Sequence, residues 1–571
     1  MKSVRMWLVN MKTELVAINA KYEHEGLAVW YLKAACEKCG LDVSVQQHSI
    51  NDTPEKIWAA IMEAAPDIVG FSCYIWNRVI VQDLIMDIKM ARPETIIIVG
   101  GPETGYEGAV EDFKAMGADY VLMGEGEYRL PVLLLDIEKQ GRTAMEEKET
   151  ESRAIEPGNY ISPFLPEHLS RVNGRIAYIE SSRGCPFNCS YCLSSENRRL
   201  TYFPSDKILP DIKALVEAGA KVIKFVDRSF NANVRHSLAI WEFIKQFDKK
   251  EVTFHFEINP DHLTVEQIAS LGGMPDGLVQ VEAGIQTTNL RTLESVARHM
   301  DVGKALGSLK ELIVRGNIHT HADLIAGLPH EDLNSFKKSF NEVYAVRPHQ
   351  LQLGFLKLLH GTGIRREADL YQYSYRNYPP YEVISSGTMP YDAILKLKGI
   401  EDVLDRFYNS GRFSLTLDYI LKLFDSAFDM FDALRCWEKE RELLFMPVSA
   451  VRLFELMREF ATGIEGINPD ILESLLGLDY ICSFKSGPLP KTMEAGDGKE
   501  TGLKILDSRE FIDDKLIQTM SKKEIRKRFI ALEGMFPVKK GAGFEYCRNR
   551  MMVDTRIFDP VTGRAKISII R

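Results

Sequence analysis

The sequence predicts an α/β protein with two successive parallel sheets, followed by a mainly helical C-terminal extension. Three observations support this fold class. Short β-branched runs alternate with amphipathic helical patterns from residue 12 to about 130, a second such series begins near residue 173, and helical periodicity dominates after residue 376. A chain of 571 residues is too long for one compact core, so several domains are expected.

The first series contains five βα units. Strands that alternate with helices imply a doubly wound, Rossmann-like parallel sheet with helices on both faces, here in a domain of residues 1–135. Sheets of this kind bind their ligands at the carboxyl ends of the strands. The five predicted strands are residues 14–19, 41–47, 66–74, 95–101 and 118–124.

Residues 136–172 are charged and punctuated by Pro and Gly, which predicts a linker, and a second βα series follows it. Residues 173–375 then predict a partial (β/α)6 barrel, a fold whose functional groups gather at the carboxyl ends of its strands. The six predicted strands are residues 175–181, 222–227, 252–259, 277–286, 318–329 and 349–359.

The C-terminal extension, residues 376–571, carries apolar residues at three-to-four spacing and is predicted to be mainly helical. Its end is expected to form a small α/β part. There, residues 522–535 are predicted as a helix, and the segment "DPVTGRAKISII" is predicted to close as a hairpin.

Composition excludes several function classes. A net charge of −9 argues against nucleic-acid binding through a broadly basic surface, and no apolar run is long enough to predict a membrane-spanning helix. The first residues lack the pattern of an export signal, so a cytoplasmic location is expected, with Met1 and Met11 both candidate starts. In a reducing compartment, clustered cysteines bind metal more often than they form disulfides.

One such cluster stands out in "SRGCPFNCSYC", where Cys185, Cys189 and Cys192 follow the first barrel strand. Three thiolates can hold three irons of a cubane [4Fe-4S] cluster and leave the fourth iron open to another ligand. The alternative is a zinc knuckle, which would need a fourth Cys or His nearby, and the next histidine lies far along the chain.

The CxxxCxxC spacing, with Tyr191 before the third cysteine and the loop placed after the first barrel strand, resembles the radical SAM superfamily. The resemblance implies that S-adenosylmethionine (SAM) chelates the open iron and is cleaved reductively to a 5′-deoxyadenosyl radical. It also implies a low-potential electron donor, such as flavodoxin or ferredoxin, as a partner.

The same resemblance implies a set of SAM-binding residues at the barrel strand ends. The segments that carry it are "FVDRSFN", "VEAGIQ" and "DLIAGLP", while "LLHGTGI" resembles the branch of the superfamily that also has cobalamin domains. For each polar residue the alternative is a helix cap or an ion pair at the barrel rim. The predicted SAM-binding residues are Tyr191, Asp227, Arg228, Asn231, Glu282, Gln286, Ile325 and Gly327, with Glu257 and Asn259 as further candidates.

The first domain resembles the cobalamin-binding module of cobalamin-dependent radical SAM enzymes through the turns "FSCYIWN", "VGGPET" and "MGEGE". A nicotinamide or flavin domain would need G-x-G-x-x-G after the first strand, and "NAKYEHEG" lacks it. His24 does not complete a D-x-H-x-x-G motif, so no histidine ligand to cobalt is expected. The resemblance implies cobalamin contacts from Tyr74, Trp76, Gly100, Gly101, Pro102, Glu103, Gly124, Glu125, Gly126 and Glu127.

Together these resemblances imply a cobalamin-dependent methyltransferase that transfers the methyl group of methylcobalamin to an unactivated carbon or phosphorus centre. The alternatives are a non-methylating enzyme (ring rearrangement, cyclisation or methylthiolation) and a cobalamin-binding sensor with a vestigial barrel. The substrate, a small molecule or peptide, is unknown. The extension is expected to close over the barrel mouth, where Lys357, His360, Tyr378 and Tyr381 could face the substrate.

Overall fold

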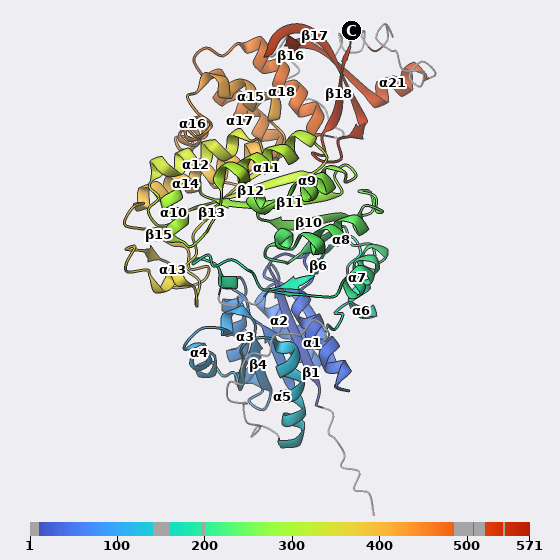
Figure 1. The fold of residues 1–571 in the computed structure, drawn as a ribbon, viewed down its shortest axis with the longest axis vertical. Coiled ribbons are helices and arrows are strands. Elements are labelled where there is room, and N and C mark those ends of the chain that lie inside the picture. The colour runs from blue at the N-terminus through green and yellow to red at the C-terminus, as the bar shows by residue number, and fades with distance from the viewer. Residues whose placement is uncertain are drawn as a thin grey trace, which may run out of the picture.

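A computed structural model describes residues 11–140, 160–195, 200–484, 506, 520–540 and 543–570. The three predicted regions follow one another along the long axis, with the N-terminal sheet at one end, the barrel in the middle and the C-terminal sheet at the other end (Figure 1). Residues 141–159 of the predicted linker and the first ten residues lie outside the described part. No helix in the described part is long and apolar enough to cross a membrane.

The N-terminal domain is the predicted doubly wound sheet. All five strands are parallel, in the order β2-β1-β3-β4-β5. The chain adds β2 on one side of β1 and β3 to β5 on the other, so the strand order switches between β1 and β3. Leu15 and Ala17 pack on one face with α1 and α5, whereas Val16 and Ile18 pack on the other face with α2 to α4. The strands are β1 Thr13–Asn19, β2 Val43–Ser49, β3 Ile68–Ser72, β4 Ile96–Gly100 and β5 Tyr120–Leu122, and the helices are α1 Leu27–Lys38, α2 Pro54–Ala64, α3 Arg78–Ala91, α4 Ala109–Ala115 and α5 Gly126–Gln140.

The middle domain confirms the partial barrel. Six parallel strands pair in chain order, and β6 and β13 form the two edges of the sheet. The strands are β6 Ile176–Ile179, β9 Val222–Phe225, β10 Thr253–Ile258, β11 Val279–Gln286, β12 His319–Ala326 and β13 Gln350–Phe355. The helices are α7 Ser205–Glu217, α8 Val234–Ile244, α9 Val265–Gly272, α10 Leu290–Ser295, α11 Val302–Arg315 and α12 Leu333–Ala345.

The inner face of this sheet is polar. Along β11 and β12 every second residue is buried, and the residues between them keep partial exposure. The strand register aligns these inner side chains in rows, because parallel strands hold paired residues on the same face. One row contains Lys224, His255, Gln280 and His319, and the next contains Glu257, Glu282, His321 and Gln350.

The extension is mainly helical, as predicted, and ends in a three-stranded antiparallel sheet. The predicted hairpin is present between β17 and β18, but residues 529–535 form strand β16 instead of continuing helix α21. Phe529 and Ala531 are buried on alternate positions of β16, which pairs with β17. Before the extension, α13 Gly363–Arg366 follows β13. The elements of the extension are α14 Tyr391–Val403, α15 Ser414–Ile420, α16 Ala427–Lys439, α17 Ala450–Thr462, α18 Pro469–Ser483, α21 Lys522–Arg528, β16 Phe529–Lys540, β17 Gly543–Phe558 and β18 Ala565–Ile570.

A buried carboxyl behind the barrel rim leads to a pH-dependent prediction. Glu331, in the loop between β12 and α12, is fully buried and accepts hydrogen bonds from Thr287 Oγ1 at 2.6 Å and Ser339 Oγ at 3.2 Å. Its Oε2 has no partner among the described residues. Burial raises the pKa of Glu331 from 4.5 to about 7, because it outweighs the two hydrogen bonds that favour the charged form.

The folded state therefore binds more protons at Glu331 than the unfolded state between about pH 4.5 and 7. The free energy of unfolding should fall by about 3 kcal/mol as the pH rises through this range, and stay level above it. Glu331→Gln should remove this contribution. The free energy of unfolding of the variant, relative to that of the wild type, should therefore be higher at pH 8 than at pH 5. Urea unfolding at the two pH values measures the change, and an equal difference at both would contradict it.

Candidate active site

The cysteine loop leaves the barrel through a short antiparallel pair, β7 Ser182–Arg183 and β8 Thr201–Tyr202. Gly184 has a φ of 96°, a left-handed conformation that turns the chain into the loop. Within the loop, the Cys192 N–H donates to the Cys189 carbonyl at 3.0 Å. Cys185 and Cys189 are buried and Cys192 is half-buried, so the three thiols lie on a tight turn at the barrel mouth.

The three thiols fit an iron–sulfur cluster better than a single metal ion. Burial raises the pKa of the Cys185 thiol, and the charges of Cys192 and Cys189 raise it further, so the three sulfurs are electrostatic neighbours. Within the described part of the chain, no three His, Cys, Asp or Glu side chains converge closely enough to hold one ion. A cubane cluster binds three thiolates at separate corners and leaves its fourth iron open, whereas a zinc knuckle needs a fourth Cys or His ligand.

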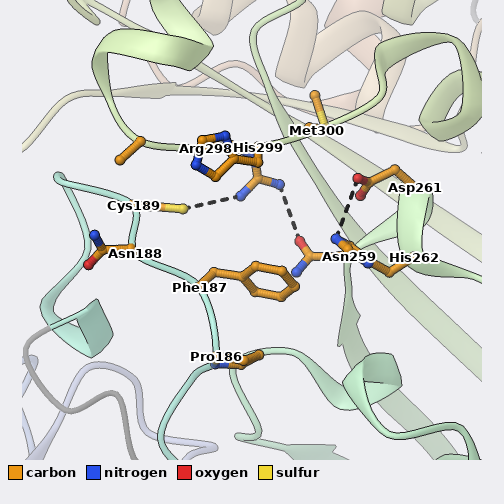
Figure 2. A pocket seen from close by; sticks show the side chains of 11 residues that line it. Pro186, Phe187, Asn188, Cys189, Asn259, Asp261, His262, Arg298, His299 and Met300 are labelled. Atoms are coloured by element: carbon orange, nitrogen blue, oxygen red, sulfur yellow. Dashed lines mark hydrogen bonds and ion pairs between the residues drawn. The ribbon is translucent and has the colours of Figure 1, made fainter.

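One cation that faces these thiols, Arg298, was not identified from the sequence. Arg298 donates through Nη1 to Cys189 Sγ at 3.7 Å and to the Tyr191 hydroxyl at 3.4 Å. Its Nη2 donates to Asn259 Oδ1 at 3.2 Å and to the Gly284 carbonyl, and its buried Nε has no partner in the described structure. Figure 2 shows Arg298 between Cys189 and Asn259. Arg298 thus joins the cysteine loop to the ends of β10 and β11, with one donor left for a ligand.

The predicted residues after β9 divide into two kinds. Asp227 is buried and accepts from the Ser181 N–H at 2.9 Å, Ser181 Oγ at 2.7 Å and Ser182 Oγ at 2.5 Å. Burial raises its pKa to about 6 in spite of these hydrogen bonds. Asn231 is also buried and binds the backbone of Asn259 at 2.8 and 2.9 Å. Arg228 remains exposed, and its charge acts on the Cys185 thiol.

Glu282 and Gln286 lie on β11 in different surroundings. Glu282 accepts from Lys224 Nζ at 3.3 Å and His255 Nε2 at 3.0 Å. Burial acts to raise its pKa, but the His255 hydrogen bond and the Lys224 charge outweigh burial and lower it to about 2. Gln286 lies where the pairing with β12 shifts by one residue, and its buried Oε1 has no partner within the described structure.

The predicted residues Ile325 and Gly327 lie at the end of β12, and Gly327 packs against Val383 of the C-terminal extension. Ile325 is half-buried, and Gly327 has a φ of 90° with a Cβ position only 2.9 Å from Val383 Cγ1. The Tyr373 hydroxyl donates to the Gly327 carbonyl at 2.8 Å. Two residues before Ile325, the buried Asp323 Oδ1 has no partner in the described part, and burial and the Glu282 and Glu257 carboxylates raise its pKa.

In the N-terminal domain, Tyr74 and Trp76 lie at the point where the sheet order reverses. Their rings stack with centroids 4.4 Å apart and an interplanar angle of 8°. Trp76 Nε1 donates to the Ile18 carbonyl at 3.0 Å, while 44% of Trp76 stays exposed. A crevice beyond the ends of β1 and β3 is where open α/β sheets bind ligands, and a flat exposed indole there suits a flat macrocycle.

In the turn after β4, Gly101 and Glu103 make close contacts with other parts of the protein. A Cβ on Gly101, whose φ is 109°, would lie 2.6 Å from the Cys73 carbonyl oxygen, so the crossing of two backbones requires glycine. Glu103 is buried, pairs with Arg78 Nη1 at 3.1 Å and accepts from the Tyr381 hydroxyl at 3.0 Å. Gly100 is half-buried and Pro102 is exposed at the carboxyl end of the sheet.

The turn after β5 contacts the stem of the cysteine loop. Glu125 and Glu127 pair with Arg183 at 3.3 and 2.9 Å, and Arg183 directly precedes Gly184 and Cys185. Gly124 lies in the turn after β5, and Gly126 begins α5 together with Glu127. The carboxyl end of the first sheet and the mouth of the barrel therefore face each other across these ion pairs.

His24 and His360 also lie between the domains. His24 Nδ1 and the Tyr178 hydroxyl are 3.1 Å apart, and burial lowers the His24 pKa. The His360 ring stacks on Tyr106 at 4.0 Å and meets Tyr381 edge-on at 4.8 Å. His360 and Tyr381 thus contact the turn after β4, whereas Tyr378 is exposed.

Comparison with protein families assigns the three regions separately. The B12 binding domain family matches residues 13–134, the radical SAM superfamily matches residues 179–343, and a family described as a protein of unknown function (DUF4080) matches residues 369–538.

Curated relatives match at low identity. A cobalamin-dependent radical SAM methyltransferase, TokK of Streptomyces tokunonensis, is 24% identical over 55% of this chain and 50% of its own length. A tRNA-2-methylthio-N(6)-dimethylallyladenosine synthase of Ralstonia pickettii is 24% identical over 45% of this chain and 57% of its own length. The chain thus spans about half the length of these relatives.

Solved structures share the fold. TsrM of Kitasatospora setae, a radical S-adenosylmethionine methyltransferase, covers 65% of this chain and 80% of its own, with a TM-score of 0.51 and 17% identity. OxsB, a cobalamin-dependent S-adenosylmethionine radical enzyme, covers 83% and 84%, with a TM-score of 0.54 and 13% identity. The chain thus carries a B12-binding domain and a radical SAM domain, which together support a cobalamin-binding radical SAM enzyme with a [4Fe-4S] cluster, SAM and cobalamin as cofactors.

Proposed function

We propose that this enzyme is a methyltransferase that methylates an unactivated carbon or phosphorus centre of a small molecule or peptide. The observation that carries the proposal is the Arg183 bridge. Its ion pairs with Glu125 and Glu127 hold the ligand-binding edge of the cobalamin domain against the stem of the cysteine loop. A substrate between the two edges would lie within reach of both cofactors.

Cys185, Cys189 and Cys192 hold the cluster in this proposal. The free Nε–H of Arg298 and the exposed guanidinium of Arg228 suit the carboxylate of SAM, because guanidinium groups bind carboxylates with charge-assisted hydrogen bonds. The unpartnered Gln286 Oε1 suits a ribose hydroxyl. Asp227 and Asn231 act through the backbone that they hold, as positioning residues.

Trp76 and Tyr74 present ring faces for the corrin, and the backbone of the turns after β4 and β5 lines the same edge. When bound, the cluster and SAM supply a carbon-centred radical, and cobalamin supplies the methyl group. The protein orients these groups and excludes water. Glu103 stays a structural residue in this proposal, because Arg78 and Tyr381 already satisfy its carboxylate.

Methyl transfer is favoured over methylthiolation by the cysteines. Methylthiolation usually needs further cysteines for a second cluster, and all nine cysteines of this chain lie in the described part. The other six do not form a second three-cysteine cluster: Cys36 and Cys39 lie at the end of α1, and the rest lie on separate elements, namely Cys73, Cys436, Cys482 and Cys547.

The test uses anaerobically reconstituted enzyme with cobalamin, reductant and SAM carrying a trideuterated methyl group. We expect S-adenosylhomocysteine together with trideuterated methylcobalamin, and 5′-deoxyadenosine as a separate product, all measured by mass spectrometry. 5′-Deoxyadenosine without S-adenosylhomocysteine would favour the non-methylating alternative, and neither product would favour a sensor. Deuterium transfer into components of a cell extract would then identify the substrate.

A further inference from the structure

The C-terminal sheet concentrates positive charge in a chain that is acidic as a whole. Residues 520–571 contain 13 Lys and Arg against five Asp and Glu, while the net charge of the full sequence is −9. The sheet lies at the end of the molecule away from the cobalamin domain (Figure 1). The positive charge is therefore local, and the composition of the whole chain conceals it.

The two faces of this sheet have different surroundings. Leu532 and Phe536 of β16 belong to a hydrophobic core that includes Leu475 and Leu478 of α18. Successive residues of a strand point to opposite faces, so the odd-numbered positions of β16 lie on the other face. The antiparallel register brings residues of β17 and β18 to that same face. We call this the basic face, and its exposed members are Lys539, Phe544, Arg548, Arg550 and Lys566.

One carboxylate holds the two arginines of the basic face. Glu533 accepts from Arg548 Nε at 3.0 Å and from Arg550 Nε at 3.1 Å. The Arg548 side chain is 80% exposed and the Arg550 side chain is 50% exposed. Within the described residues, the Nη groups of both arginines have no hydrogen-bond partner. Two guanidinium groups are thus fixed side by side, with their outer donors directed to solvent.

Few carboxylates offset this charge. Besides Glu533, the basic face carries Asp554, which is already bonded to Arg528 Nη2 at 2.7 Å. Helix α21, which packs on one end of the face, has Glu524 as its acidic residue, and this carboxylate accepts from the N–H of Ser521 at the helix start. The same helix adds exposed lysines at Lys522, Lys523 and Lys527.

We propose that the basic face binds a single-stranded nucleic acid through its phosphates, with a base stacked on Phe544. Guanidinium groups bind phosphates with paired hydrogen bonds, and residues two apart on a strand are about 7 Å apart, a distance similar to that between successive phosphates of an extended strand. The Phe544 ring is 64% exposed and lies beside Lys539 in the register. Aromatic rings stack on bases of any sequence, so no particular sequence is expected to be preferred.

The apolar content of the basic face favours a nucleic acid over a membrane. Surfaces that bind anionic bilayers bury a broad apolar area beside their cations. Among the members of the basic face, Phe544 supplies the large exposed apolar group, and a single ring suits one stacked base. The bound strand is a partner and not the group that is methylated, because the sheet lies at the far end of the molecule from the cobalamin domain (Figure 1). The inference goes beyond the proposed methyl transfer and does not depend on it.

The test measures binding of fluorescein-labelled oligouridylate and oligothymidylate to the full-length protein, by fluorescence anisotropy over a series of salt concentrations. No SAM or reductant is added, so the result is independent of turnover. The double variant Arg548→Gln with Arg550→Gln removes both guanidinium groups, and Phe544→Ala removes the ring.

Matched control variants change the same residue types elsewhere in the extension. Arg441→Gln with Arg452→Gln removes two arginines, each 45% exposed, near α16 and on α17. Phe445→Ala removes a ring that is 58% exposed after α16. Both controls should bind the oligonucleotides as the wild type does.

We expect the arginine double variant to bind at least about tenfold more weakly. Its slope of log affinity against log salt should be shallower by about 1.4, because each phosphate contact of a single strand contributes about 0.7. Phe544→Ala should weaken binding roughly tenfold with an unchanged slope, because stacking involves no counterion release. A wild type that binds neither oligonucleotide, or a double variant with unchanged affinity and slope, would overturn the proposal.

Two further measurements separate other outcomes. Binding to vesicles of phosphatidylserine and phosphatidylcholine that the double variant loses, without oligonucleotide binding by the wild type, would assign the face to a membrane and overturn the proposal. If circular dichroism shows that the glutamine variant is unfolded, Arg548→Lys with Arg550→Lys decides. This variant keeps the charge and should bind more weakly with an unchanged salt slope, because lysine lacks the paired donors of arginine. Binding as tight as that of the wild type would contradict the role of the two guanidinium groups.

Discussion

Replacing Cys185, Cys189 or Cys192 by alanine is expected to abolish the iron–sulfur chromophore and reduce 5′-deoxyadenosine formation to background. In the proposed site each thiolate holds one corner of the cubane, and the turn offers no other sulfur in its place. Iron and sulfide content, visible absorbance and product formation measure the effect after anaerobic reconstitution. The loss should be complete for each single variant, because a cluster held by two thiolates is not retained.

The matched control is Cys39→Ala, which removes an exposed thiol at the end of α1. It should bind the same amount of iron and sulfide as the wild type. A brown, active Cys192→Ala variant would contradict the assignment of the cysteine loop.

Breaking the Arg78–Glu103 ion pair is expected to destabilise the cobalamin domain strongly. The two side chains are only 7% and 5% exposed, and Arg78 Nη2 also donates to the Tyr106 hydroxyl at 2.6 Å. Arg78→Met leaves the Glu103 carboxylate buried without its cation, which costs about 3–5 kcal/mol. The urea midpoint of unfolding of the cobalamin domain, followed by circular dichroism, should fall accordingly.

The double variant Arg78→Met with Glu103→Gln should recover most of this loss, because it leaves no unpaired charge. Glu103→Gln alone also separates two roles of this residue. A structural Glu103 predicts unchanged cobalamin affinity in folded protein, whereas a cobalamin-binding Glu103 predicts weaker binding. An Arg78→Met protein as stable as the wild type would contradict the structural role.

Local sequence patterns were sufficient to predict the two parallel sheets. The βα alternation predicts both parallel sheets, because strand and helix periods differ over short windows. The spacing of Cys185, Cys189 and Cys192 is also a local pattern, and the cluster loop that it predicts stays a prediction. Residues 529–535 are an exception: their pattern fits a helix, but pairing with β17 makes them a strand.

Side-chain partners that are distant in the chain were not predictable. Arg298 binds Cys189, 109 positions before it, and nothing in "ARHM" distinguishes it from other arginines. Glu103 lies on a glycine turn at a strand end, which is typical of ligand contacts, but its carboxylate meets Tyr381 through the folding of a different region. The sequence shows which strand end carries a side chain, and the tertiary structure decides what that side chain binds.

The contact between Glu103 and Tyr381, 278 positions apart, has a consequence for folding during synthesis. The N-terminal sheet is made first, yet the surroundings of its buried ion pair are completed only after the ribosome has passed Tyr381. A nascent chain that ends before this point holds the Arg78–Glu103 pair without its aromatic cover. Folding of this enzyme during synthesis is therefore completed late, when the extension packs against the two domains that were made before it.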